Sequence, residues 1–541
     1  MFKITEKNRK WWIFVAMSGA LSVAFLDQTA ISVILPPIQK DLGLSNVMLQ
    51  WVINAYLLSL AALVIFGGKL GDILGHKRTF LAGIIIFVLA SIFCAAAQTS
   101  YWLLTSRIIQ GVGGAFMIPV TSVMMAHAFS ESERGKVMGL YVAVASIFLS
   151  LGPLLSGLLA HYFNWRWVFW INVPISLLSI GLTIVAVPAR ENQRDTLKPL
   201  DWLGFLTFSL FIATLVVGLI EAVNLGWSSK EIILLFVIAA FSAIAFIFVE
   251  RKAPDPIVSF SLFTRKTFLS ANLCLLFFTC AFSSSVFWAI LLQKVMGYSP
   301  AATGLFYLPV TIPVMFMAPL GGMLRDKYGP RLPVLMGSGV VALGSFWIAL
   351  SALKGHYSAM FPGFLLFGLG PALVYSAVMA TNISSVPLSQ MGMASGISNG
   401  IRQLGRVLGV AMIGSVISNI EHARLIHSHF DTTGKLSQVS DQQLTHLLSN
   451  PAVEKHILSG LSLSEINHMH LLLKSVLTFA FSMGMVLAGF LLISTLGISF
   501  FLPNKPLRLL RDEKIKIALV KESEAPAGKP KTDPISLDKF V

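Results

Sequence analysis

The sequence predicts an all-α polytopic membrane protein with fourteen transmembrane helices. Of its 541 residues, 55% are hydrophobic and 12% are charged, and the mean hydropathy is +0.77. No ordinary water-soluble globular protein of this length has such a composition. The apolar residues also gather in runs of about 20, the length that a helix needs to cross about 30 Å of hydrocarbon. Short polar loops separate these runs.

The first apolar run follows a basic start and is about 25 residues long. The apolar core of a cleavable signal peptide has about 7–15 residues, so we expect this run to be a retained span. The seventh and eighth runs are expected to be a pair inserted between two groups of six. The fourteen expected spans are 11–36, 48–70, 79–98, 101–127, 134–161, 166–188, 201–221, 230–250, 268–292, 302–324, 332–353, 357–384, 396–420 and 470–501.

Lysines and arginines accumulate in alternate loops, on the same side as the basic N-terminus. Because such residues concentrate on the cytoplasmic side, we expect both termini to be cytoplasmic in a bacterial cytoplasmic (inner) membrane. The net charge of +15 then reflects topology, and no nucleic-acid partner is expected. Cys94, Cys274 and Cys280 all lie in apolar runs, which makes a disulfide framework or a thiolate metal site implausible.

An eleven-residue pattern occurs twice. Residues 67–77 read GGKLGDILGHK and residues 321–331 read GGMLRDKYGPR, and each follows the second span of a six-span half. A repeat of this kind places a substrate site between the halves, near the middle of the membrane. The expected parts are an N-terminal six-helix bundle at 1–190, the inserted pair at 191–262, a C-terminal six-helix bundle at 263–502 with an outer loop at 421–469, and a cytoplasmic tail at 503–541.

The outer loop and the tail carry weaker signals. Apolar periodicity predicts short helices around 444–448 and 457–461, and the several histidines of the loop are interpreted as solvated, with pH sensing or metal binding as the alternative. The tail is charged and poor in aromatic residues, which predicts disorder. Its first part, from Lys505 to Lys516, is expected to contact anionic membrane lipid.

Five motifs together resemble one family. The loop GGKLGDILGHKR is similar to the signature loop of the major facilitator superfamily. LDQTAISVILP at 26–36, QWVINAY at 50–56, RIIQGVGG at 107–114 and WRWVFWINVP at 165–174 are similar to motifs of its fourteen-helix drug:proton antiporter branch. The resemblance covers essentially the whole membrane part. It implies the major facilitator fold, two six-helix bundles plus two extra helices, with the proton gradient as the energy source and no cofactor.

An aspartate and an arginine are placed at comparable depth in two spans. Asp27 lies about 13 Å below Pro36 and Arg107 about 9 Å below the outer end of its span, at 1.5 Å per residue. A buried guanidinium costs several kcal/mol unless it is paired or hydrated. In the resembling family these positions of spans 1 and 4 are associated with proton coupling. We therefore expect Asp27 to be the proton site with Arg107 as its partner, and a purely structural ion pair is the alternative.

Glycines and charges in the repeated loops predict gating, because small residues permit sharp turns and an acid at a helix end can latch one conformation.

Spans 4 and 5 carry small residues and a proline for close packing. The span 5 pattern is similar to the antiporter motif G-x8-G-x3-G-P-x2-G-G, but Phe148 and Ser156 stand where glycines are usual. The gating residues are Gly68, Asp72, Gly75, Lys77 and Arg78 with Gly322, Asp326, Gly329 and Arg331, and the packing residues are Gly111, Gly114, Gly152, Pro153 and Gly157.

Span 13 carries two arginines one turn apart, Arg402 and Arg406, where the resembling family usually has a glycine at 406. They would either add positive potential to a central cavity or snorkel to the cytoplasmic interface. Asp27 is the one acid deep in a span, which favours neutral, amphipathic, monocationic or anionic cargo over dications. The residues expected to line the cavity are Tyr56, Phe116, Met117, Trp288, Tyr307, Asn382, Arg402 and Arg406.

The sequence does not predict an enzyme. The G-x-S-x-G match at 396–400 follows no strand, and the chain contains no phosphate-binding G-x-x-x-x-G-K-[ST] loop. The expected function is proton-coupled export of small amphipathic compounds (multidrug efflux) by alternating access, in a protein that functions as a monomer. The alternatives are a transporter of a specific metabolite or siderophore, by export or uptake, and a membrane sensor or scaffold.

Overall fold

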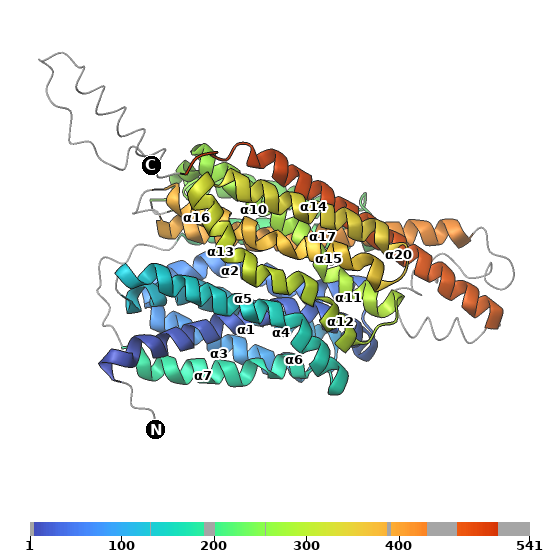
Figure 1. The fold of residues 1–541 in the computed structure, drawn as a ribbon, viewed down its shortest axis with the longest axis horizontal. Helices are drawn as coiled ribbons and strands as arrows, with labels where there is room; N and C mark the ends of the chain where they lie inside the picture. The colour runs from blue at the N-terminus through green and yellow to red at the C-terminus, as the bar shows by residue number, and fades with distance from the viewer. Residues whose placement is uncertain are drawn as a thin grey trace, which may run out of the picture.

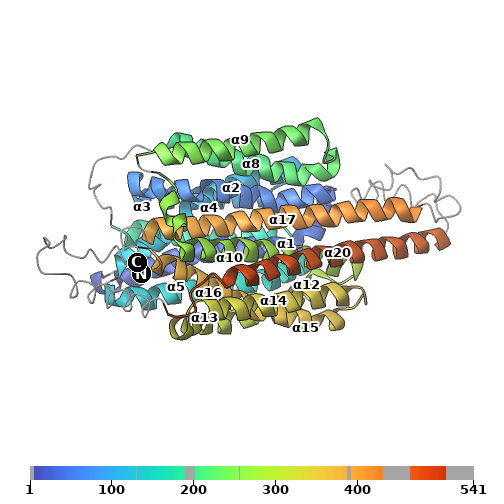
Figure 2. The same ribbon diagram turned by 90° about the horizontal axis from the view of Figure 1, so that it is seen from above.

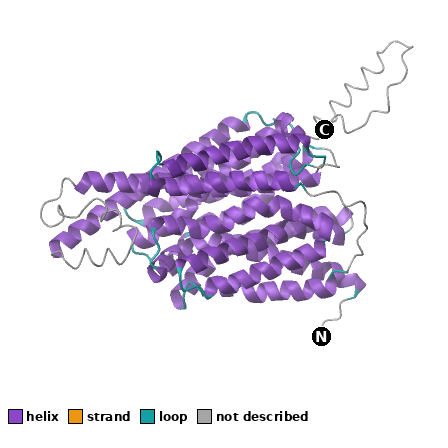
Figure 3. Cartoon of the chain, turned by 180° about the vertical axis from the view of Figure 1, so that it is seen from behind, coloured by secondary structure: helices purple, strands orange, loops and turns teal. Residues whose placement is uncertain are grey.

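The computed structural model describes residues 5–129, 131–188, 201–254, 256–386, 391–429 and 463–506. All regular structure in these ranges is helical, as Figure 3 shows, and the expected fold class is confirmed. Thirteen helical segments among the described residues are long and apolar enough to span a membrane. A further helix, α5 (Glu131–Tyr162), occupies the position of the fifth expected span.

The helices of the first half follow the expected spans closely. Ser45 and Thr99 cap two of them, since their side chains accept hydrogen bonds from the backbone N–H groups of Met48 (3.1 Å) and Trp102 (3.3 Å). The sixth span is a short helix followed by a longer one. The elements are α1 (Glu6–Leu42), α2 (Asn46–Leu74), α3 (His76–Ala95), α4 (Ser100–Ala128), α5, α6 (Trp167–Trp170) and α7 (Asn172–Ala186).

The inserted pair forms an antiparallel hairpin of α8 (Trp202–Leu225) and α9 (Lys230–Lys252). Figure 2 shows this hairpin along one edge of the molecule, where α8 contacts both α2 and α17 (Met391–His429). Because α2 and α17 come from different halves, α8 bridges the two halves of the chain.

Three spans of the second half are interrupted, where the hydropathy predicts continuous helices. One passes through 3₁₀ and π turns between Ser283 and Val295, and the others break at Tyr307 and Gly370. The elements are η1 (Phe260–Thr264), α10 (Lys266–Phe282), η2 (Ser283–Phe287), α11 (Trp288–Ile290), η3 (Leu291–Val295), α12 (Pro300–Phe306), α13 (Leu308–Tyr328), α14 (Arg331–Ala352), α15 (Tyr357–Leu369), α16 (Pro371–Ser384), α17 and α20 (Leu463–Ser499).

The helices run side by side, so the molecule has two ends (Figure 1). We call the end at which α1 begins and α20 finishes the terminal end, and the opposite one the far end. At the far end α17 and α20 extend beyond the other helices, which corrects the expected outer loop at 421–469: its first nine residues continue α17, and α20 begins at Leu463. The helices expected at 444–448 and 457–461, and the tail beyond 506, lie outside the described residues.

Glycines allow backbone contact where α4 crosses its neighbours. A Cβ at Gly111 would lie 2.5 Å from the carbonyl oxygen of Tyr56 on α2, and one at Gly113 would lie 2.5 Å from the backbone nitrogen of Phe87 on α3. Gly114 is less tightly packed, at 3.4 Å from the Tyr56 hydroxyl. Close approach of this kind is how helices associate tightly in lipid, where burial against a neighbour brings little hydrophobic gain. It brings the polar side chains of α4 into the centre of the first half.

Candidate functional site

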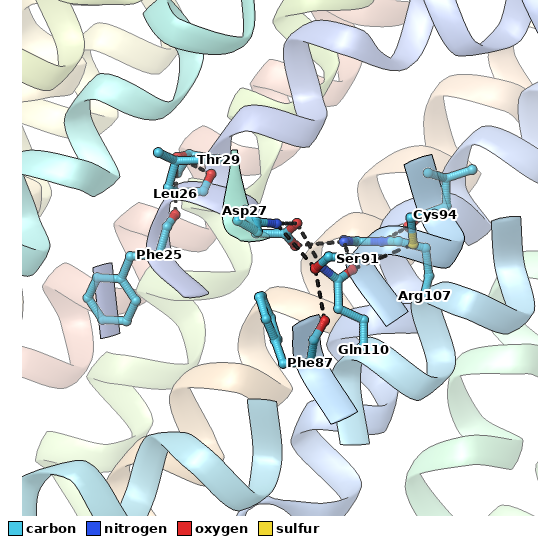
Figure 4. Close-up of polar contacts among 11 residues, drawn as sticks. Phe25, Leu26, Asp27, Thr29, Phe87, Ser91, Cys94, Arg107 and Gln110 are labelled. Atoms are coloured by element: carbon cyan, nitrogen blue, oxygen red, sulfur yellow. Dashed lines mark hydrogen bonds and ion pairs between the residues drawn. The ribbon is translucent and has the colours of Figure 1, made fainter. Parts of the chain in front are cut away.

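A buried ion pair lies in the middle of the first half. Nη1 of Arg107 is 2.6 Å from Oδ2 of Asp27, and the two side chains are each 1% exposed (Figure 4). The structure therefore brings together the two residues whose depths match in the sequence. Arg107 also donates through Nε to the carbonyl oxygen of Val52 at 3.0 Å, and its guanidinium lies 4.5 Å from the centre of the Tyr56 ring.

Three further polar side chains complete the network around this pair. Gln110 accepts from Arg107 (2.6 Å) and donates to Oδ1 of Asp27 (3.1 Å) and to Oγ of Ser91 (2.9 Å). Asn172 donates to the same Asp27 oxygen at 3.3 Å. The network therefore ties together α1, α3, α4 and α7. Sequence reasoning did not single out these residues, although Gln110 lies three residues after Arg107 on one helix face and Asn172 falls inside a quoted motif.

The surroundings of Asp27 fit a carboxylate that carries its charge. Three N–H donors, from Arg107, Gln110 and Asn172, point at its two oxygens. The other buried acids of the described residues are Glu250 and Glu421, and each lies within nine residues of the end of its helix. Chemically, this arrangement can hold a charge deep in the membrane and respond to its loss, because protonation replaces one acceptor position with a donor.

The two repeated loops have matching backbone conformations. Gly75 ends α2 with φ +92°, and Gly329 ends α13 with φ +86°, a region that favours glycine. Two residues further on, Lys77 and Arg331 each cap the last helix of their own half. Lys77 donates to the carbonyls of Ile184 (3.0 Å) and Val187 (2.5 Å) near the end of α7, while Arg331 donates to those of Leu502 (2.9 Å) and Phe500 (2.6 Å) after α20.

The other loop residues are placed less specifically. A Cβ at Gly68 would be 3.6 Å from Pro119, and one at Gly322 would meet nothing within 4 Å. Arg78 is exposed. The carboxylate of Asp326 is 73% exposed and pairs at 2.9 Å with its neighbour Arg325, so it does not form a buried latch in this conformation. The side chain of Asp72 lies outside the described residues.

Removing either cap should loosen the terminal end. We expect Lys77→Met or Arg331→Met to lower the free energy of unfolding by about 1 kcal/mol, since each removes two hydrogen bonds from a partly exposed cation to helix-end carbonyls. Thermal unfolding of the purified protein measures this, with Arg78→Met as the control beside Lys77. An equal loss of stability in Arg78→Met would show that the capping hydrogen bonds contribute nothing to the free energy of unfolding.

Three of the expected cavity residues, Trp288, Asn382 and Met117, pack inside a single half, which corrects the prediction for them. Trp288 donates to Sδ of Met485 at 3.3 Å and contacts Phe364, with ring centres 4.6 Å apart. Asn382 exchanges two amide hydrogen bonds with Asn272, and Met117 is fully buried with its backbone against Gly83. The partners of these three side chains come from the same half. Tyr307 donates to the Ser285 carbonyl and also lies beside the Ser32 hydroxyl of α1, so it is placed where the two halves meet.

Phe116 is half-buried, with its ring 6.4 Å from that of Phe66, which in turn stacks on Phe205 of α8 at 4.5 Å. It therefore lies toward the inserted pair. Tyr56 is fully buried beneath the guanidinium of Arg107, within the polar network.

The two α17 arginines do reach the opposite half. Arg406 donates through Nη1 to Oε1 of Gln28, and the Arg402 guanidinium lies 5.6 Å from the centre of the Phe25 ring, both on α1. At 1.5 Å per residue they lie about 16 and 22 Å from the first residue of α17. The snorkelling alternative is therefore wrong for this conformation, because both side chains cross to α1 instead of extending to the end of their helix.

Two helical halves around buried polar side chains define a polytopic membrane transporter. The chain belongs to the Major Facilitator Superfamily, whose family profile matches residues 17–410. It is a transporter and not an enzyme, and this sets aside the sensor or scaffold alternative.

Curated relatives carry names of drug resistance. The chain is 31% identical over 456 residues to the multidrug resistance protein Stp of Mycobacterium tuberculosis, covering 84% of this chain and 81% of that protein. It is 28% identical to the multidrug transporter protein MdtP of Bacillus subtilis, covering 77% of each chain. It is 29% identical to the tetracenomycin C resistance and export protein of Streptomyces glaucescens, covering 76% of this chain and 77% of that one.

Solved structures share the fold at low sequence identity. A bacterial homologue of the human lysosomal transporter Spinster, in an inward-facing and unoccupied conformation, matches with a TM-score of 0.63 at 17% identity, covering 91% of this chain and 97% of that one. A D-xylose–proton symporter matches with a TM-score of 0.57 at 15% identity, covering 91% and 97%.

Proposed function

We propose that this protein is a proton-coupled secondary active transporter that exports small amphipathic compounds from a bacterium. It works as a monomer in the cytoplasmic membrane, with the terminal end facing the cytoplasm and the proton gradient as its energy source, without a cofactor. The buried Asp27–Arg107 network is the observation that carries the proposal. The names of the relatives, multidrug resistance and export, support the direction and the kind of cargo.

Protonation of Asp27 would act on helix contacts. A proton on the carboxyl group removes its charge and turns one oxygen into an O–H donor, which accepts only weakly from the N–H groups that now face it. The attraction to Arg107 on α4 is then lost, while Arg107 keeps the Val52 carbonyl and the Gln110 oxygen as acceptors. The link between α1 and the rest of the network therefore depends on the protonation state, which is the property that coupling requires.

Contacts between the two halves at the far end support alternating access. Gln293 donates to the Val33 carbonyl at 2.7 Å, and Gln50 donates to Oγ of Ser418 at 3.4 Å. A cavity between the halves there, lined by apolar side chains such as Phe287 together with the polar side chains of Gln50, Ser418, Lys294 and Glu421, has a volume of about 70 Å³. This is well below the roughly 300–1,000 Å³ of a small-molecule site, so we interpret the conformation as closed at the far end.

One helix crossing at the far end should control this closure. A Cβ at Gly157 on α5 would meet the Pro300 carbonyl and lie 3.1 Å from Cα of Gly304 on α12. We expect Gly157→Leu to prevent the two halves from closing there and to shift the population toward the outward-open form. Labelling of a cysteine introduced at Ile53, which lines the far-end cavity, should become at least several-fold faster from the far side.

Gly181→Leu is the matched control, because a Cβ at Gly181 on α7 meets nothing within 4 Å. Unchanged labelling in Gly157→Leu, with the protein folded, would argue against closure at this crossing.

A transporter of a specific metabolite or siderophore, by export or uptake, is the second candidate. The observation that favours it is the arginine pair between the halves, since charged side chains at a binding site favour recognition of a particular chemical group.

Purified protein in liposomes tests the proposal directly. With an acidic lumen and no nucleotide, outward proton flow should drive a transported amphipathic dye, taken from a panel of anionic, neutral and cationic dyes, into the vesicles, and a protonophore should abolish the accumulation. Uptake that is insensitive to both the pH gradient and the protonophore would exclude proton-coupled transport of that dye. A panel of dyes that all behave in this way would overturn the proposal.

A further inference from the structure

Two arginines of α17 lie between the halves and have no acidic partner in the part of the chain that the structure describes. Asp27, Asp41 and Asp326 pair with Arg107, Arg166 and Arg325, and no carboxylate of the described residues lies within ion-pair distance of Arg402 or Arg406. The buried Glu250 and Glu421 lie near the ends of their helices. The central region therefore carries two positive charges beyond the neutral Asp27–Arg107 pair.

Donor groups around the arginines remain unused. Nε of Arg402 and Nε2 of Gln28 are buried and have no hydrogen-bond partner among the described residues. Gln28 is the residue after Asp27, and its oxygen accepts from Arg406, so both donors lie near the level of the polar network. A buried donor without a partner is unfavourable, and an unpaired buried cation is more so. A bound acceptor with negative charge would satisfy them.

Arg402 and Arg406 each keep some exposed surface, although they lie many residues from either end of α17. They share one face of the helix, since residues four apart are neighbours. Two guanidinium groups one turn apart match the oxygens of a carboxylate, sulfonate or phosphate, to which arginine binds with paired hydrogen bonds.

Aromatic side chains lie beside the charged groups. The Phe25 ring contacts Arg402, and Tyr375 of α16 is close enough to both arginines to interact electrostatically. Tyr375 in turn contacts Phe278 and Phe282, with ring centres 5.3 and 6.4 Å away. Such rings suit the apolar body of a ligand, and the arginines suit its charged group.

We propose that Arg402 and Arg406 form the anion-binding part of the cargo site, so that the protein prefers amphipathic anions to amphipathic cations. The inference rests on the proposed transport function and specifies its substrate class. The donors available for the anionic group are the two guanidinium groups and the Gln28 amide, and the hydrocarbon part of the ligand packs against Phe25 and Tyr375.

Two probes with one apolar body and opposite charges test this preference. The full-length protein in nanodiscs of zwitterionic lipid is titrated with pyrenebutyrate and with pyrenebutyltrimethylammonium, and binding to empty nanodiscs is subtracted. We expect the anion to bind at least tenfold more tightly than the cation. Equal affinities, or tighter binding of the cation, would overturn the proposal.

Variants locate the site. Arg402→Gln with Arg406→Gln should weaken binding of pyrenebutyrate at least tenfold and leave the cation unchanged or tighter, whereas the double lysine variant should keep most of the affinity for the anion. Arg166→Gln, a change at a partly exposed ion pair with Asp41, is the matched control and should have no effect. Unchanged binding of the anion in the folded double glutamine variant would overturn the proposal. If that variant does not fold, the proposal is tested by the affinities of the intact protein for the two probes and by the affinity of the double lysine variant for pyrenebutyrate.

Binding of a probe needs no proton gradient, so the binding test and the transport test can fail independently of each other. Tight binding of the anion without proton-driven transport would leave the anion site standing and overturn the coupling. Proton-driven transport without a preference for the anionic probe would support the coupling and overturn the anion site.

Discussion

Asp27→Asn should abolish proton-driven accumulation of cargo while the protein still folds and binds cargo. The amide has nearly the shape of the carboxyl group but cannot gain or lose a proton in the physiological range. It resembles the protonated form of Asp27, which the transport cycle itself must tolerate. Arg107 keeps the Val52 carbonyl and the Gln110 oxygen as acceptors, which limits the loss of stability.

The expected size of the effect is at least a tenfold loss of accumulation in liposomes under a pH gradient, with cargo affinity changed less than threefold. Asp41→Asn is the matched control. It lies near the end of the same helix, and its side chain is 46% exposed in an ion pair with Arg166 at 2.7 Å. If Asp27→Asn accumulates cargo as the intact protein does, Asp27 is not the coupling residue and the ion pair is structural.

Arg107→Gln should destabilise the protein more than any other single change considered. It removes a fully buried side chain that binds Asp27, Gln110 and the Val52 carbonyl and packs on Tyr56. Breaking a buried pair by removing one partner leaves an uncompensated charge, and the usual loss is about 3–5 kcal/mol. Arg166→Gln breaks an exposed pair, for which we expect a loss of about 0–1 kcal/mol.

A double-mutant cycle separates the charge from the packing. Asp27→Asn combined with Arg107→Gln has no uncompensated buried charge, so it should be more stable than Arg107→Gln alone. The free energies of unfolding of the four proteins, measured in one detergent, give the coupling energy of the pair. A coupling energy near zero would mean that the ion pair contributes nothing to the fold.

The sequence predicts the membrane-spanning helices well because the requirement for about 20 apolar residues is strict in lipid. The depth of a residue follows from the same count, and so the sequence alone places Asp27 and Arg107 at comparable depth. The repeated loop in the sequence also corresponds to repeated structure. Gly75 and Gly329 share one backbone conformation, and Lys77 and Arg331 both cap the last helix of their half.

The residues lining a central cavity were harder to predict, and the reason is physical. A helix in lipid is apolar on both its lipid face and its protein face, so hydropathy gives the depth of Trp288 or Met117 but not the direction of the side chain. Charged residues escape this ambiguity, since they must find a partner or a hydrated space. The arginines of α17 are therefore placed near the centre, whereas Trp288 and Met117 are buried within one half.

The breaks in the second half also escape prediction from hydropathy. The 3₁₀ and π turns between Ser283 and Val295 and the break at Tyr307 lie in apolar sequence that would suit a continuous helix. The Tyr307 hydroxyl donates to the Ser285 carbonyl at 2.7 Å. Such a contact between sequentially distant helices is a tertiary effect with no local signal.

The measurement that most directly tests proton coupling is the movement of protons driven by cargo alone. Liposomes containing the intact protein and a pH-sensitive dye, with no initial pH gradient, receive an outwardly directed gradient of a cargo shown to bind. Protons should enter the lumen as cargo leaves, so that the lumen acidifies, and Asp27→Asn should show no such change. Cargo efflux through the intact protein without acidification of the lumen would contradict proton-coupled antiport.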